Sequence, residues 1–95
     1  MDAHDTNEER SGEEDAQALG LRALVWTLVV PDRAMRLLAV TGLEPHDLRA
    51  RAGDPAVIAA ALGFLEAHEP DLIECAAELG VKPAALVAAR ARLEA

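Results

Sequence analysis

The segment GLEPHDLRA at residues 42–50 recurs as GVKPAALVA at residues 80–88, which is 38 positions further along the chain. In each copy a glycine is followed three residues later by a proline, and three residues after that by a leucine. Glycine commonly ends a helix and proline commonly occupies the first position of the next one. Each copy therefore predicts a helix, a tight turn and a second helix.

The repeat extends beyond the turn, because the same offset relates Trp26 to Phe64. We interpret the chain as two similar three-helix halves, packed about an approximate two-fold axis with helix-turn-helix-like packing. On this interpretation Trp26 and Phe64 are buried, and so are the repeated leucines Leu48 and Leu86. Chance similarity between two alanine-rich helical segments is the other interpretation of the same pattern.

Prolines and glycines divide the chain into further segments with helical spacing of apolar residues. The predicted helices are residues 14–29, 32–41, 45–52, 55–68, 71–79 and 83–93. No segment alternates apolar and polar residues convincingly, so no sheet is expected. The predicted fold is a compact all-α bundle of about six short helices. Its first helix is apolar nearly all round, which is typical of a central helix packed on several sides.

Length and charge define one domain and one tail. A chain of 95 residues is long enough for a single small domain. The net charge is −8, and residues 1–15 alone hold seven acids and one base. Such a segment has too few large apolar side chains to offset the entropy of ordering. We predict a disordered acidic tail over residues 1–13 and a single helical domain over residues 14–95.

The sequence favours a cytoplasmic protein. Its one cysteine, Cys75, excludes a disulfide framework and fits a reducing compartment. The acidic N-terminus does not resemble a secretory signal. The densest apolar run, residues 19–30, contains Arg22 and is shorter than the ~20 residues that span a bilayer. No membrane association is expected.

Residue types that carry chemistry are scarce. Zinc ligands usually occur in closely spaced pairs, and no such pair is present. The predicted domain offers Thr27, Thr41 and Cys75 as nucleophiles and two histidines, His46 and His68, as bases. Gln17 is its one amide side chain for an oxyanion hole. The glycines lie singly and form no phosphate-binding loop. We predict a protein that is not an enzyme, with no catalytic residue, cofactor or metal.

Charged side chains provide the candidate partner-binding residues. Basic residues gather around one helix junction and acidic residues around the equivalent junction of the other half: Arg33, Arg36, Arg49 and Arg51, against Glu66, Glu69, Glu74 and Glu78. Segregated charge suits docking or self-association. The expected function is non-enzymatic protein–protein interaction with an unknown protein partner, including a homodimer. An ordinary charged surface is the alternative interpretation.

Nucleic-acid binding by the helix-turn-helix unit is the alternative function. Its reading helix would be residues 45–52, which carry Arg49 and Arg51 beside Asp47, with Glu44 just before them. Phosphate contacts need clustered positive charge, and the predicted domain is net negative. We therefore expect no binding to nucleic acid.

Several segments resemble a small bacterial family known as a domain of unknown function. They are TGLEP at 41–45, LRARAGDP at 48–55, AALGFL at 60–65, EPDL at 69–72 and the alanine-rich helix from Pro83. The resemblance covers roughly residues 15–94 and implies a compact, all-helical, cytoplasmic protein of alphaproteobacterial type. It carries no activity, ligand or catalytic residue.

Overall fold

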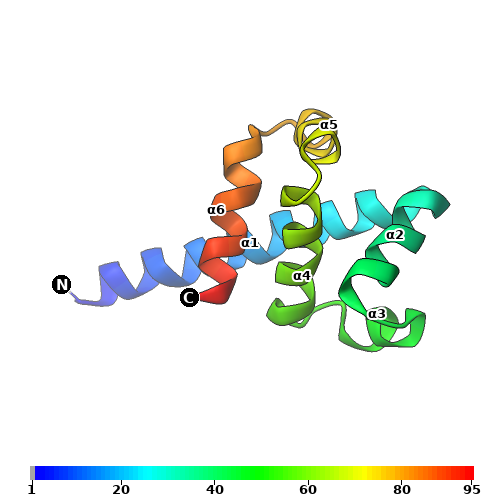
Figure 1. Cartoon of the computed structure of the whole chain (residues 1–95). Coiled ribbons are helices and arrows are strands. Elements are labelled where there is room, and N and C mark those ends of the chain that lie inside the picture. The colour runs from blue at the N-terminus through cyan, green and yellow to red at the C-terminus, as the bar shows by residue number, and fades with distance from the viewer. Residues whose placement is uncertain (1) are drawn as a thin grey trace.

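Six helices form the protein, and no strand occurs within residues 2–95 (Figure 1). The computed structural model describes the backbone of residues 2–95 and the side chains of residues 12–95. The helices are α1 (Asp2–Val29), α2 (Pro31–Thr41), α3 (Pro45–Arg51), α4 (Pro55–Glu66), α5 (Glu69–Leu79) and α6 (Pro83–Glu94). The prediction of an all-α bundle is confirmed.

Prolines and glycines mark the helix ends as predicted. Proline is the first residue of α2, α3, α4 and α6. The glycines that end α2 and α5, Gly42 and Gly80, have left-handed φ angles of 75° and 74°. The amide of Gly42 donates to the carbonyl of Leu38, 2.9 Å away. Glycine adopts this conformation without the steric penalty of a Cβ, so both turns depend on it.

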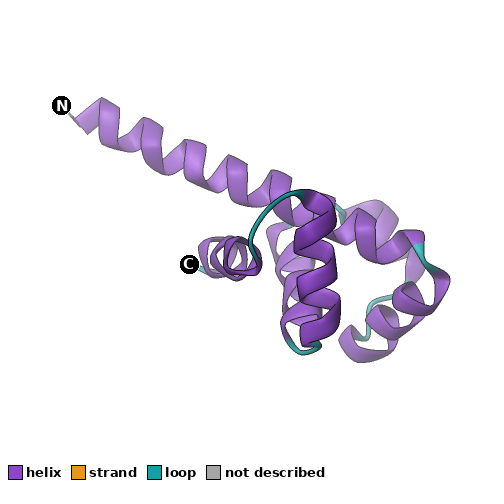
Figure 2. Ribbon diagram, turned by 90° about the horizontal axis from the view of Figure 1, so that it is seen from above, coloured by secondary structure: helices purple, strands orange, loops and turns teal. Residues whose placement is uncertain are grey.

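The first helix is longer than predicted. It begins at Asp2, whereas the sequence pattern predicts its start at residue 14. No proline interrupts residues 2–29, and acidic residues in a first turn are favoured by the helix dipole. The N-terminal half of α1 projects beyond the other helices (Figure 2). The predicted disordered acidic tail, residues 1–13, lies mostly outside the residues whose side chains are described and stays a prediction.

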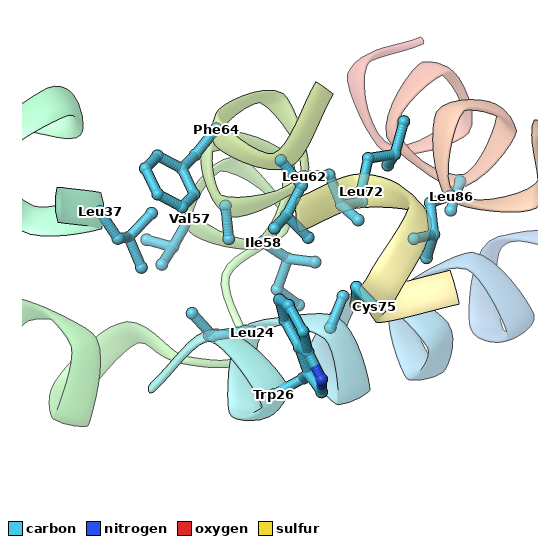
Figure 3. Close-up of a cluster of buried hydrophobic side chains, with 14 of the residues drawn as sticks. Leu24, Trp26, Leu37, Val57, Ile58, Leu62, Phe64, Leu72, Cys75 and Leu86 are labelled. Atoms are coloured by element: carbon cyan, nitrogen blue, oxygen red, sulfur yellow. The ribbon is translucent and has the colours of Figure 1, made fainter. Parts of the chain in front are cut away.

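The core is built on the crossing of α1 and α4. A Cβ added to Gly20 would overlap the Cγ2 atom of Ile58 and would lie 3.3 Å from Cδ1 of Leu62. Only glycine therefore permits this close approach. Ile58 and Leu62 are fully buried, together with Leu24 of α1 (Figure 3). The apolar side chains that surround them form one continuous cluster.

The contacts at this crossing fit the approximate two-fold axis. Gly20 and Ile58 are equivalent positions of the 38-residue repeat, and equivalent residues can touch only near the axis that relates them. Likewise α2 packs on α4 while its counterpart α5 packs on α1. The two aromatic side chains are buried as predicted, with Trp26 8% and Phe64 6% exposed.

The similarity of the halves is closest in their first two helices. α6 packs extensively on α1, α4 and α5, whereas α3 has no extensive contact with any described helix. α3 has 7 residues and α6 has 12. α3 is short because Gly53 and Asp54 follow soon after its end at Arg51, and Pro55 then begins α4. Leu48 of α3 and Leu86 of α6 are nevertheless both buried, as predicted.

Candidate protein-docking surface

An apolar groove lies between α1 and the end of α5. Its volume is about 540 Å³, and it is lined by Ala18, Leu21, Arg22, Val25, Trp26 and Leu79. Arg22 is its only ionisable lining residue, and Nη2 of Arg22 donates to the carbonyl oxygen of Leu79 at 3.0 Å. This hydrogen bond satisfies a free carbonyl at the C-terminus of α5. We call this feature the α1–α5 groove.

One face of α1 remains open along the groove. The sequence pattern predicts that this helix is packed on several sides, and it is, but Leu21 is 37%, Val25 54% and Val29 70% exposed. These residues follow Ala18 at helical spacing and form a continuous stripe. The α1 stripe is defined as Ala18, Leu21, Val25 and Val29. The helical spacing of these residues can be read from the sequence. Because the helix is apolar nearly all round, that spacing does not show which face lacks a partner.

Two of the predicted partner-binding residues, Arg33 and Glu78, contact Trp26, and Glu78 stays exposed while it does so. The guanidinium of Arg33 lies over the indole ring, with Cζ 3.5 Å from the ring centroid. Its Nη2 atom donates to the carbonyl oxygen of Trp26 at 2.7 Å. Glu78 of α5 accepts a hydrogen bond from the indole Nε1 of Trp26. The structure therefore joins a basic residue of one predicted group to an acidic residue of the other through the tryptophan.

Arg36 also connects the two halves. Its Nη1 atom lies 3.1 Å from Oδ2 of Asp71, which is buried. His68 Nδ1 lies at the same distance from that oxygen. The Arg36 guanidinium is also 5.8 Å from the centroid of the Phe64 ring. These contacts hold α2 against α4 and α5, so Arg36 fixes helices in place while half of its side chain faces solvent.

The other predicted residues are spread over separate surfaces. Glu66 accepts from Arg90 Nη1 at 3.1 Å, and this pairing raises the pKa of Arg90. Arg49 is exposed on α3, where Arg51 pairs with Asp54 at 3.2 Å. Glu69 and Glu74 border a shallow hollow on the outer face of α5. The structure does not bring all eight residues into one site, and no single one of these surfaces contains more than a few of them.

Cys75 is poorly suited to act as a nucleophile. The side chain is completely buried, and burial raises the pKa of its thiol to about 11. A thiol with this pKa stays protonated near neutral pH, and the thiolate is the reactive form. Among the residues with described side chains, no three His, Cys, Asp or Glu residues are grouped closely enough to hold a metal ion. None of the described helices combines the length and hydropathy needed to cross a membrane.

The helix proposed to read DNA, α3, carries mixed charge at its start. Glu44 and Asp47 form a reciprocal capping box, and both carboxylates also lie near the His46 ring, at 3.3 Å and 3.6 Å. Arg49 and Arg51 lie in its last turn. Two arginines beside two carboxylates do not form the basic cluster that phosphate contacts require.

Comparison with known proteins gives a family and no activity. Residues 13–95 match the family described as a protein of unknown function (DUF3572). No curated protein and no solved structure matches the chain.

Proposed function

The chain belongs to the DUF3572 family, and on that premise we propose that it is a non-enzymatic protein-interaction module whose α1–α5 groove receives an amphipathic helix. The observation that carries this proposal is the α1 stripe, whose valines are exposed beside an almost wholly apolar groove. Contiguous apolar surface of this kind marks interaction sites on soluble proteins.

The apolar lining of the groove supports a ligand with an apolar face. An amphipathic helix that docks in an apolar groove presents side chains at positions i, i+3, i+4 and i+7. Trp26 forms part of the groove wall with the small fraction of its surface, 8%, that is exposed. Its ring is held by Arg33 and Glu78, so the wall is already ordered before a partner arrives.

The same features support a role other than catalysis. Arg22 is the one ionisable side chain in the groove, and its guanidinium is occupied by the Leu79 carbonyl. The guanidinium of an arginine stays protonated near neutral pH and so cannot serve as a general base. The thiol of Cys75 is buried in the core and protonated, which also disfavours a nucleophilic role. A single free cysteine supports a reducing, cytoplasmic location.

Affinity capture from the native cell tests this proposal. The bait is the full chain, compared with Val25→Glu, which places a charge in the groove. The matched control is Val87→Glu, because Val87 is 41% exposed on α6 and lies outside the groove. Circular dichroism establishes that all three baits have the same helix content.

We expect one set of proteins to be retained by the wild type and by Val87→Glu, and to be lost with Val25→Glu. Because the contact is mainly apolar, retention should persist as salt is raised. Retention of the same proteins by all three baits would contradict docking in the groove.

A further inference from the structure

We propose that the outer face of α5 is a second docking surface, which binds a basic amphipathic segment of a partner protein. This surface is separate from the α1–α5 groove, and the inference does not depend on what the groove binds. It is a shallow hollow of about 480 Å³ on α5, which lies at an edge of the bundle (Figure 1). We call it the α5 hollow, and it is lined by Glu69, Pro70, Ile73, Glu74 and Ala77.

The floor of the α5 hollow is apolar. Ile73 is 49% exposed, although isoleucine is among the residue types that are most often buried. It comes three residues after Pro70 and four before Ala77, so the three side chains lie on one face of the helix. α5 is attached to the bundle by its other face, where Leu72 and Cys75 are buried. Ile73 is therefore available for contact with another molecule.

Acidic side chains border this floor on both sides. With about 3.6 residues per turn, Glu69 lies on one side of Ile73 and Glu74 on the other. Both glutamates are exposed, and neither forms an ion pair or hydrogen bond within residues 12–95. Glu74 also comes four residues before Glu78, and like charges at this spacing destabilise a helix. The fold gives Glu74 no stabilising contact, so its charge is open to a partner.

The bases around α5 do not neutralise this border. The helix itself contains four acids and no lysine or arginine. Lys82 comes after its C-terminal end, at the N-cap of α6. The bases that approach α5 are engaged with other groups: Arg36 and His68 with the buried Asp71, Arg33 with the Trp26 ring, and Arg22 with the Leu79 carbonyl.

An apolar floor inside an acidic border defines the chemistry of the partner. The complementary surface has apolar side chains with lysine or arginine on both sides of them. From Glu69 to Ala77 the helix rises roughly 12 Å, so about two turns of a docked helix cover the hollow. Nucleic acid is disfavoured because its phosphates carry the same sign of charge. A second copy is disfavoured because arginines of this chain are paired internally, among them Arg51 with Asp54 and Arg90 with Glu66.

The complex should be weak and sensitive to salt. Exposed charge pairs each contribute little, and the contact is short. We expect a dissociation constant on the order of 100 µM at physiological salt, with tighter binding as salt is lowered. This salt dependence is opposite to the salt-resistant retention expected for the α1–α5 groove.

Titration of the full chain with a synthetic peptide tests the surface. The probe is a fluorescently labelled peptide of about 14 residues, with leucines at helical spacing and lysines on both sides of them. The double variant Glu69→Gln with Glu74→Gln should weaken binding about three- to ten-fold, and Ile73→Ala should also weaken it. The matched control is Glu13→Gln with Glu14→Gln, which removes two exposed acids of α1 and changes the net charge equally. This control should bind as the wild type does.

Three results would overturn the proposal. Equal weakening by the α1 control would show a general attraction between a cationic peptide and an acidic protein. An unchanged affinity of Ile73→Ala would show that the apolar floor makes no contact. Amide chemical shifts that change only along the α1 stripe, and not on α5, would place the peptide in the α1–α5 groove.

Thermal unfolding followed by circular dichroism separates docking from a structural role. Because Glu74 has no stabilising contact within residues 12–95, Glu74→Gln should keep the helix content and should not lower the Tm. A lowered Tm would assign Glu74 to the stability of α5 and contradict its role as a docking residue.

Discussion

The two turns of this protein, between α2 and α3 and between α5 and α6, share a left-handed glycine and a proline that starts the next helix, yet the helices after them pack differently. Gly42 and Gly80 have φ angles within 1° of each other, and a proline starts each succeeding helix. However, α6 lies across α1 and α4, while α3 contributes little beyond Leu48 to the core. Local backbone chemistry therefore specifies a turn without specifying how the next helix packs.

The difference is explained by the residues available after the turn. α6 continues for three helical turns and buries Leu86 and Ala89, with Leu93 partly buried behind them. In α3 the position equivalent to Leu93 is Pro55, which already begins α4. The first half therefore has no counterpart of the long α6 contact, and α6 packs against both halves.

The largest effect should come from truncating the leucine of the extensively packed helix. Leu86→Ala leaves a cavity at a fully buried site and should lower the free energy of unfolding by ~2–5 kcal/mol. Leu48→Ala, at the equivalent site on the loosely packed α3, should fall at the low end, about 2 kcal/mol, because the site can collapse more easily. Urea unfolding monitored by circular dichroism measures both. Equal losses would show that α3 and α6 are energetically equivalent after all.

The next largest effect on stability is expected at the crossing of α1 and α4. Gly20→Ala places a methyl group against Ile58 and should cost ~1–3 kcal/mol, although alanine has the higher helix propensity. Ile58→Ala should relieve this overlap, so the double variant should lose less than the sum of the two single losses. Thermal or urea unfolding of the four proteins gives the coupling. Strict additivity would mean that α1 and α4 do not approach at Gly20.

Substitution of either turn glycine, Gly42 or Gly80, should have a similar effect on stability. No atom lies within 4 Å of a Cβ added to Gly42 or Gly80, so only the left-handed backbone opposes a side chain. Alanine at either position should therefore lower the free energy of unfolding by about 1 kcal/mol. Urea unfolding curves of the two alanine variants show whether the loss comes from the backbone of the turn alone or also from the packing of the helix that follows. A much larger loss at Gly80 would show that the position of α6 depends on its turn as well as on its core contacts.

The smallest effect is expected where the first half ends. Asp54 caps α4 by accepting from the amide of Ala56 at 2.9 Å, and this hydrogen bond, followed by that to Arg51, lowers the pKa of its carboxyl. A lowered pKa in the folded state stabilises the protein above the ordinary value of 3.8, and the contribution disappears as pH falls through the lower value. Asp54→Asn should slightly lower the Tm at neutral pH. The difference in Tm between this variant and the wild type should vanish once the pH is below the lowered pKa of Asp54. A Tm difference that persists in acid would show that the variant is destabilised by the changed side-chain geometry at the cap and not by the loss of the negative charge.

The sequence selected charged residues as candidates for partner binding, but it could not show the contacts that these residues make within the fold. Arg33, Arg36 and Glu78 were selected as partner-binding residues, and each contacts a side chain of another helix. One-dimensional charge grouping cannot show that α2 and α5 flank the same core. It therefore does not reveal that Arg33 and Glu78 both contact Trp26, or that Arg36 pairs with Asp71. The α1–α5 groove could not be recognised either, because Leu79 is more than fifty residues from its other lining residues.

By itself the sequence determined the elements of this protein: six helices, four of which start at a proline, the two glycine turns and the burial of Trp26 and Phe64. These depend on local backbone preference and on apolar periodicity, both of which act within a few residues. Only the tertiary structure decided that α6 packs on both halves and that one face of α1 stays open. Those outcomes depend on which helices compete for the same apolar surface, and that competition is settled only when every helix has been placed.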